Sequence, residues 1–198
     1  MNNLLGFAYL NIDRADLAIA PMRKALEYQT LNLGWRIELI RALFEARQLD
    51  KAQEEILRLQ ADGYLGIRGF DDLIPHYVNW WQGGEKVHAW HFFQNAIRNQ
   101  PEHILLLNAA AWLLATDPAP PAPPEEALRL ARHAMELAPV PQILDTLAAA
   151  FAANGQFAKA SSTAQQAIAL ALKNGDIPTA KAIGQRLDAY RQNQPWRE

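Results

Sequence analysis

Apolar and small residues recur along this chain at the three- and four-residue steps that place side chains on one face of an α-helix. The clearest examples each begin at an alanine: Ala18, Ala52, Ala89, Ala127 and Ala160. Successive alanines lie 34, 37, 38 and 33 residues apart. A period near 34 residues, carried by paired amphipathic helices, is typical of a helical repeat.

Each of these alanines opens a row of three small or apolar residues at steps of four and three. The rows are Ala18, Met22 and Ala25; Ala52, Ile56 and Leu59; Ala89, Phe93 and Ala96; Ala127, Ala131 and Ala134; and Ala160, Ala164 and Ala167. Small residues on such a face allow two helices to approach closely. Each row therefore predicts the contact face of the second helix of a pair.

A preceding helix is expected about twelve residues before most of these alanines, with a close-contact residue followed three positions later by a large apolar one. The pairs are Gly6 and Tyr9, Ile40 and Leu43, Tyr77 and Trp80, and Ala148 and Phe151. In the fourth unit the pair is Ala111 and Leu114, and four extra residues lengthen the connection before Ala127. These lie in the proline-rich segment 117–124, which we interpret as a stiff turn; a polyproline ligand is the alternative.

Prolines and glycines mark several expected helix boundaries. Pro101 and Pro139 should end two of the second helices. Pro75 and Pro178 are expected in first turns, where a missing N–H is harmless. Pro21 lies further inside a helix, so a late start or a kink is expected there.

The pattern resembles that of the tetratricopeptide repeat (TPR) family. The best-matching unit reads NNLLGFAYLNIDRADLAIAPMRKALEY, and the last, LDTLAAAFAANGQFAKASSTAQQAIAL, is similar. The resemblance covers about residues 1–172 and implies an all-α, right-handed α-solenoid of five TPR-like helix pairs. Its units are expected at about 1–32, 33–66, 70–103, 104–140 and 141–172.

Residues 173–198 are expected to form a capping helix and a short tail. The helix should run from about Ile177 to Gln192, and Trp196 should fold back on it. Its apolar face would carry Ile183, Leu187 and Tyr190, and its solvated face Lys181, Arg186 and Asp188.

The stretches AAWLLATDP, EEALRLARHAMELAP and RLDAYRQNQPWRE also look like the C-terminal end of large bacterial repeat proteins. Some of those carry an upstream glycosyltransferase-like membrane domain. Met1 falls inside the first predicted helix, where Leu4, Phe7 and Ile12 form an apolar surface. Because a terminal repeat normally has a polar outer face, we expect upstream repeats or self-association to cover this end.

In TPR proteins the first helices of successive units line a concave groove. On this register the resemblance implies a candidate partner-binding groove. Its main residues are Phe7, Asn11, Ile37, Arg41, Phe44, Val78, Trp81, Asn108, Trp112 and Asp145. Asn3 and Gln142 lie beside them. Aromatic side chains with a few amides and an arginine suit an extended peptide or a partner helix. For Trp81 and Trp112, packing in the core is an equal alternative.

Some family members grip a C-terminal carboxylate with lysines and asparagines on successive first helices. Here Phe7 stands where an amide would be required, and no lysine lines the expected groove. That carboxylate clamp is therefore not expected.

Composition narrows the function. The net charge is −2, from 19 Lys and Arg against 21 Asp and Glu, so the basic surface of a nucleic-acid-binding protein is missing. The chain contains no cysteine. No segment reaches the ~20 apolar residues of a membrane span. Cytoplasmic and periplasmic locations both remain open.

Motifs for chemistry are also missing. The sequence has no GxSxG, HExxH or glycine-rich phosphate loop. His88 and His91 are spaced for a metal but lack an evident third ligand. We therefore expect a non-catalytic protein–protein interaction scaffold without cofactor or metal. The second hypothesis is a C-terminal substrate- or partner-recognition domain of a bacterial membrane glycosyltransferase-like protein.

Overall fold

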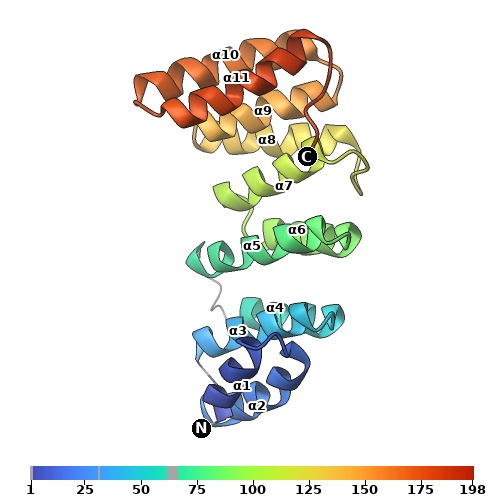
Figure 1. Cartoon of the computed structure of the whole chain (residues 1–198), viewed down its shortest axis with the longest axis vertical. Helices are drawn as coiled ribbons and strands as arrows, with labels where there is room; N and C mark the ends of the chain where they lie inside the picture. The colour runs from blue at the N-terminus through green and yellow to red at the C-terminus, as the bar shows by residue number, and fades with distance from the viewer. Residues whose placement is uncertain (1, 31, 62–66) are drawn as a thin grey trace. The chain divides into compact units, whose positions relative to one another are not determined.

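The structure of the protein is a computed structural model that describes residues 2–30, 32–61 and 67–198. Within these ranges it contains α-helices and no strand. The helices are α1 (Asn2–Leu10), α2 (Ala15–Tyr28), α3 (Leu33–Glu45), α4 (Leu49–Ala61), α5 (Ile67–Gln82), α6 (Lys86–Asn99), α7 (Ile104–Thr116), α8 (Pro124–Leu137), α9 (Pro141–Ala153), α10 (Phe157–Lys173) and α11 (Ile177–Arg191). Figure 1 shows them following one another as pairs, with α11 unpaired at the end.

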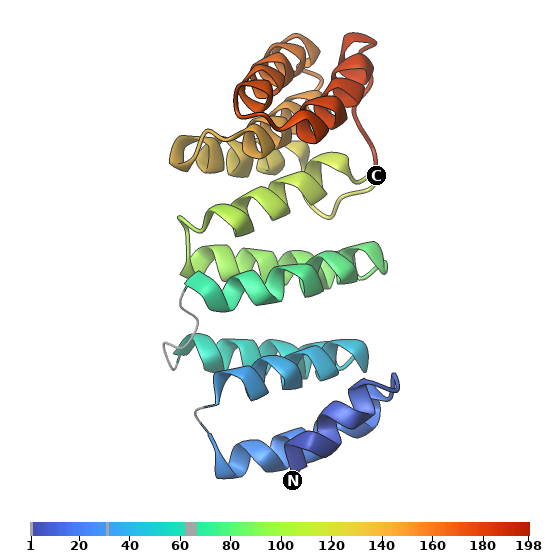
Figure 2. The same cartoon turned by 60° about the vertical axis from the view of Figure 1, so that its left-hand side comes forward.

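The chain divides into two compact units, unit 1 (Met1–His76) and unit 2 (Tyr77–Glu198), and the division falls within α5. In unit 1, α2 packs against both α1 and α3, and α3 packs against α4. In unit 2, α7 packs against α6, α8 and α9, and α9 packs against α8, α10 and α11. Both views of the ribbon show the two helices of a pair running in opposite directions (Figure 2).

All five repeat alanines are buried, each with 0% of its surface exposed. The other members of the five rows are also buried, with exposures of 5% or less. The row prediction is therefore confirmed, and these side chains form the contact faces of α2, α4, α6, α8 and α10.

The close-contact residues of the first helices are buried as well. Ile40, Tyr77, Ala111 and Ala148 are each 0% exposed. Gly6 of α1 lies so close to α2 that a Cβ atom there would be 2.5 Å from Met22 Cγ. A glycine at this position is thus required by the approach of the two helices rather than by a turn.

Aromatic rings fill the space between the C-terminal half of α5 and α6 in unit 2. Tyr77 stacks on Phe92 with ring centroids 5.5 Å apart and meets the edge of Phe93 at 5.3 Å. Trp80 meets Phe92 at 5.1 Å in an edge-on arrangement. Large rings thus take the place that alanines occupy between α9 and α10.

Helix boundaries follow most of the predicted signals. Pro101 and Pro139 lie just beyond α6 and α8, and Pro178 lies in the first turn of α11. Asp176 caps α11 by accepting a hydrogen bond from Thr179 N at 3.0 Å. The prediction for Pro75 is wrong: α5 begins at Ile67, so this proline is inside the helix. It is exposed, and the proline ring therefore meets solvent rather than a packed neighbour.

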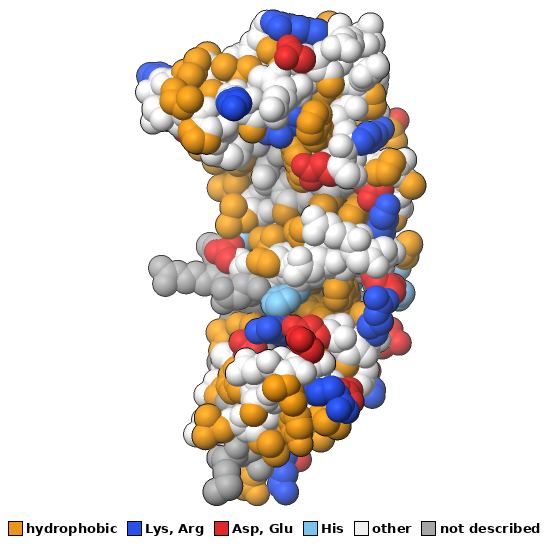
Figure 3. Space-filling model, in the orientation of Figure 1, with side chains coloured by type: hydrophobic (Ala, Val, Ile, Leu, Met, Phe, Trp, Pro, Cys, Tyr) orange, Lys and Arg blue, Asp and Glu red, His pale blue; other side chains and the backbone are white. Residues whose placement is uncertain are grey.

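Unit 1 exposes large apolar side chains on its first helix and the turn that follows it. Leu4, Leu5 and Ile12 have exposures of 75%, 48% and 63%. Figure 3 shows hydrophobic side chains open to solvent at this end of unit 1.

Candidate functional site

A cavity of about 230 Å³ opens on the face of unit 2 that α7, α9 and α11 form together, which we call the α7/α9/α11 face. Its lining residues are Asn108 and Trp112 from α7, Gln142, Asp145 and Thr146 from α9, and Thr179, Ala182 and Arg186 from α11. Three residues of the predicted groove, Asn108, Trp112 and Asp145, thus meet at one place, with Gln142 beside them. Two consecutive first helices, α7 and α9, supply part of the lining, and α11, which we expected only as a cap, supplies the rest.

An ion pair joins two walls of this cavity. Arg186 Nε and Nη2 donate to Asp145 Oδ1 and Oδ2 at 3.0 and 2.6 Å. The exposed fractions of these side chains are 15% for Arg186 and 8% for Asp145. Burial raises the pKa of Asp145 above its ordinary value, and the hydrogen bonds from Arg186 offset part of that effect. The pair fixes the position of the guanidinium group in the cavity wall.

The same guanidinium group lies against two indole rings. Arg186 Cζ is 5.2 Å from the ring centre of Trp112 and 5.9 Å from that of Trp196. Both distances are within the range of a cation–π contact. Trp196 therefore folds back onto α11, as predicted. Its Nε1 atom is buried and has no hydrogen-bond partner, so the ring is held by its faces.

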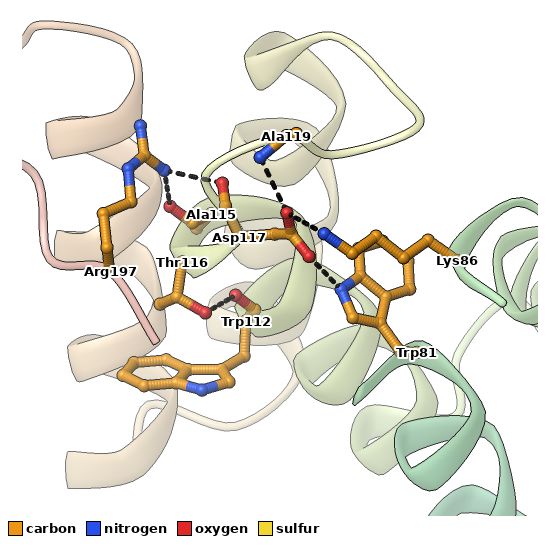
Figure 4. A network of polar contacts seen from close by, with 8 residues as sticks. All are labelled: Trp81, Lys86, Trp112, Ala115, Thr116, Asp117, Ala119 and Arg197. Carbon is orange, nitrogen blue, oxygen red and sulfur yellow. Dashed lines mark hydrogen bonds and ion pairs between the residues drawn. The ribbon is translucent and has the colours of Figure 1, made fainter. Parts of the chain in front are cut away.

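Residues 195–198 cross the C-terminal end of α7 as an extended segment. Arg197 Nη1 donates to the carbonyl oxygens of Ala115 and Asp117 at 2.9 and 3.0 Å (Figure 4). The backbone N–H of Glu198 donates to Thr116 O at 3.1 Å. These carbonyls belong to the end of a helix, where no further turn is available to pair with them. The segment thus supplies the missing partners.

Glu198 completes the contact with α7. Its Oε2 atom accepts a hydrogen bond from Trp112 Nε1 at 3.1 Å. Trp112 thereby contacts Arg186 with its ring face and Glu198 with its ring N–H. One predicted groove residue links the cavity wall to the extended segment.

Asp117 organises the neighbouring part of unit 2, beyond the end of α7. Trp81 Nε1 donates to Asp117 Oδ2 at 2.6 Å, and Lys86 Nζ and Ala119 N each donate to Oδ1 at 2.7 Å (Figure 4). Burial alone would raise the pKa of this carboxyl, but the three donors outweigh it and hold the pKa below its ordinary value. A second cavity of about 250 Å³ lies here, with Trp81, Lys86, Asp117 and Glu198 among its lining residues.

Trp81 is 3% exposed, and its one polar atom bonds to Asp117. This placement favours a packing role for Trp81, which was one of the two predicted alternatives. Trp112 is only half-buried and lines the cavity. Val78, one turn before Trp81 on α5, is half-buried too.

The remaining predicted groove residues belong to unit 1. Phe44 is buried, and its ring centre is 5.9 Å from that of His76. Arg41 Nε bonds to Glu45 Oε1 at 2.8 Å. Phe7 and Ile37 are half-buried, and Asn11 is exposed. The side chain of Asn3 lies outside the described residues.

Sequence reasoning missed three members of the site. Arg186 was placed on the solvated face of α11, yet it is largely buried against Asp145; that prediction is wrong. Asp117 and Lys86 were not singled out at all. One signal was present: an aspartate at a groove position, Asp145, required a cation nearby, and α11 offered Lys181 and Arg186.

The spacing of His88 and His91 is not matched by a gathering of metal ligands. In the described ranges, no three His, Asp or Glu side chains come together as a metal site. His88 Nδ1 instead lies 3.3 Å from Glu85 Oε2 on the exposed surface of α6. Across the same ranges, no helix is both long and apolar enough to cross a bilayer.

Comparison with known proteins identifies the architecture. No protein-family model and no curated protein matches the sequence. Among solved structures, the chain is similar to a thermophilic TPR protein of Thermus thermophilus, with 18% identity, a TM-score of 0.52, and coverage of 96% of this chain and 97% of that one.

Two further structures give lower scores. The TPR2AB domain of yeast Sti1, in a complex with pHSP90, has 14% identity, a TM-score of 0.49, and coverage of 97% and 96%. The P58(IPK) TPR domain has 13% identity, a TM-score of 0.46, and coverage of 96% and 55%. With the buried alanine rows and the paired helices, the first of these likenesses establishes that this chain has the fold of a TPR-type helical repeat.

Proposed function

We propose that the protein is a non-catalytic interaction scaffold that binds a segment of a partner protein on the α7/α9/α11 face. The observation that supports this most directly is the convergence of Asn108, Asp145 and Arg186 with Trp112 around one cavity. Aromatic and arginine side chains are enriched among the residues that dominate binding at protein interfaces. A fixed arginine and a half-buried indole also lose little conformational freedom when a partner binds.

The size of the cavity favours a peptide over a small molecule. Pockets that enclose drug-sized ligands generally measure about 300–1,000 Å³, whereas this cavity measures about 230 Å³. One or two side chains of a partner fit inside it, and the remainder of the partner would lie along the helices. Asn108 Oδ1 is buried without a hydrogen-bond partner, so a backbone N–H of an inserted peptide would satisfy it.

Photo-cross-linking tests this proposal in the full chain. A photoreactive amino acid replaces Gln142, which is exposed at the cavity, or Gln165, an exposed glutamine on α10 that does not line it. We expect partner proteins to cross-link to position 142. This cross-linking should be lost when Trp112→Ala is added. Equal capture from positions 142 and 165, or capture that is insensitive to Trp112→Ala, would contradict the proposal.

The second hypothesis, recognition on behalf of a membrane glycosyltransferase-like protein, would use the same face. A bound acceptor protein would then cross-link from position 142 just as another partner would. The identity of the captured protein separates the two contexts, because the second requires a protein that is glycosylated by a linked enzyme.

A further inference from the structure

The extended segment 195–198 contacts the α7/α9/α11 face through three consecutive side chains, and each meets a different group. Trp196 lies over the guanidinium of Arg186. Arg197 bonds to two carbonyl oxygens at the end of α7. Glu198 accepts the indole N–H of Trp112. A single peptide segment therefore contacts three chemically different groups of this face.

Each of those features selects a residue type. A guanidinium fixed by a carboxylate presents its flat face to aromatic rings. Unpaired carbonyls at a helix end, together with the helix dipole, attract cations. An indole N–H is a donor with no acceptor capacity, so it suits a carboxylate. The face thus matches an aromatic, a basic and an acidic residue in succession.

The backbone also takes part. The N–H of Glu198 donates to Thr116 O, so a peptide bond of the segment pairs with the last turn of α7. Any peptide can supply this bond, whatever its side chains. It fixes the register in which the three side chains meet their partners.

The segment is held in a way that allows exchange. Arg197 and Glu198 are exposed, and the Nε1 atom of Trp196 is buried without a hydrogen bond. Residues 195–198 form no helix or turn of their own, so the contacts described for this segment are those with the face. A competing peptide could thus replace its contacts one for one.

We propose that the α7/α9/α11 face recognises an extended partner segment of aromatic–basic–acidic sequence, and that Trp196-Arg197-Glu198 occupies this face as an intramolecular competitor. The inference rests on the proposed function and specifies the ligand chemistry of the same site. A tethered competitor acts at an effective concentration on the order of millimolar, so it weakens the binding of a free peptide without abolishing it. Partner binding would then displace residues 195–198.

A peptide of the chain's own sequence is the direct probe. Fluorescein-labelled Gln-Pro-Trp-Arg-Glu is titrated into the full chain, and its end is amidated so that the glutamate side chain is the only carboxylate among its amino acids. Anisotropy is measured with the natural protein and with Trp196→Ala/Glu198→Ala. We expect the double variant to bind the peptide at least tenfold more tightly, because its own segment no longer competes.

Peptide and protein variants test the specificity. In the Trp196→Ala/Glu198→Ala background, Trp112→Phe keeps the ring and the Asp145–Arg186 pair but removes the N–H, so affinity for the peptide should fall several-fold. Replacing tryptophan by alanine in the peptide, or glutamate by lysine, should reduce affinity at least tenfold. Arg191→Ala is the control, because Arg191 is an exposed arginine on α11, the helix that carries Arg186. This variant should leave the affinity for the peptide unchanged.

Equal affinity of the natural protein and the double variant would overturn the inference, as would equal binding of the alanine-substituted peptide. Trp196→Phe gives a further check: since Nε1 has no partner, phenylalanine should still compete. If these tests fail while a partner still cross-links from position 142, the proposed function stands and only this inference falls. If only the cross-linking fails, the proposed function falls, and the face remains a site that binds the peptide without a protein partner.

Discussion

Arg186 and Asp145 form a two-point ion pair, with N–O distances of 3.0 and 2.6 Å, that ties α11 to α9. The two residues are 41 positions apart in the sequence. The pair stands in the wall of a cavity, and Trp112 covers one side of the guanidinium. It therefore serves the packing of the last helix and the chemistry of the α7/α9/α11 face at once.

Asp145→Asn should destabilise unit 2 by about 2 kcal/mol, because it leaves a largely buried guanidinium without its carboxylate. Arg186→Gln should cost a similar amount for the converse reason. In the double variant the loss should be smaller than the sum of the two, since neither charge is then left alone. Urea unfolding followed by circular dichroism measures all three free energies.

The matched control for this cycle is Asp188→Asn, also on α11. Asp188 is 71% exposed and pairs with Arg191 at 3.5 Å, so its removal should change the free energy of unfolding by less than about 0.5 kcal/mol. Strictly additive losses at positions 145 and 186 would show that the two side chains do not interact as described.

Asp117 predicts an acid-sensitive contact between α7 and the α5–α6 pair. Hydrogen bonds from Lys86, Ala119 N and Trp81 hold its folded pKa below the ordinary value despite burial. The stabilisation is thus fully present above about pH 4, the unfolded pKa, and is lost as the pH falls through the folded pKa. We expect Asp117→Asn to lower stability by about 1–2 kcal/mol at pH 7 and to flatten the pH dependence below pH 4.

Urea midpoints measured between pH 2 and pH 7 give this comparison. The control is Glu126→Gln, which removes a carboxylate that pairs with Arg129 on the exposed side of α8. An unchanged slope in Asp117→Asn would show that this carboxyl is not stabilised in its charged form.

The rows of small residues were predictable because their effect is local. Ala18 and its counterparts must be buried wherever a helix carries three such residues on one face, whichever helix lies opposite. The register of the TPR resemblance placed Asn108, Trp112 and Asp145 on first helices. Their meeting with Thr179, Ala182 and Arg186 of α11 around one cavity was not part of that prediction.

Long-range polar pairing was not predictable in the same way. Arg186 lies next to Leu187 on α11 and carries a charge, so helical periodicity alone puts it near solvent. Its burial depends on Asp145, 41 residues earlier, and nothing in the local sequence of either residue selects the other. The hydrogen bonds of Asp117 were not predictable either. A proline-rich segment indicates a turn, but it does not indicate which donors lie near that turn.

Two glycines in helix interiors should respond in opposite directions to the same substitution. Gly6→Ala places a Cβ 2.5 Å from Met22 Cγ, and Met22 is fully buried, so the side chain has little room to move. The cost of overpacking, about 1–3 kcal/mol, should exceed the ~1 kcal/mol that alanine gains over glycine in a helix. Unit 1 should therefore be destabilised.

Gly184→Ala on α11 meets no atom within 4 Å of the added Cβ. Only the gain in helix propensity applies, so unit 2 should be stabilised by about 0.5–1 kcal/mol. Amide hydrogen exchange read separately in α2 and α10 assigns each change to its unit. Destabilisation by both substitutions would mean that the contact of Gly6 with α2 does not explain the first.

His76 should make the stability of unit 1 depend on pH near neutrality. Burial lowers the pKa of His76, the positive charge of Arg41 lowers it further, and Glu45 opposes the shift in part. Since the folded pKa lies below the unfolded value of about 6.5, the stabilisation is complete above that value and is lost as the pH falls from 6.5 towards the folded pKa. Hydrogen-exchange protection of α3, where Phe44 contacts the imidazole, should thus decrease over this interval.

His76→Phe keeps a ring against Phe44 and should remove the pH dependence of this protection. His88→Gln, at an exposed histidine in unit 2, is the control and should leave the pH dependence intact. Protection of α3 that stays constant from pH 7.5 to pH 5 in the natural protein would refute a half-buried, neutral His76.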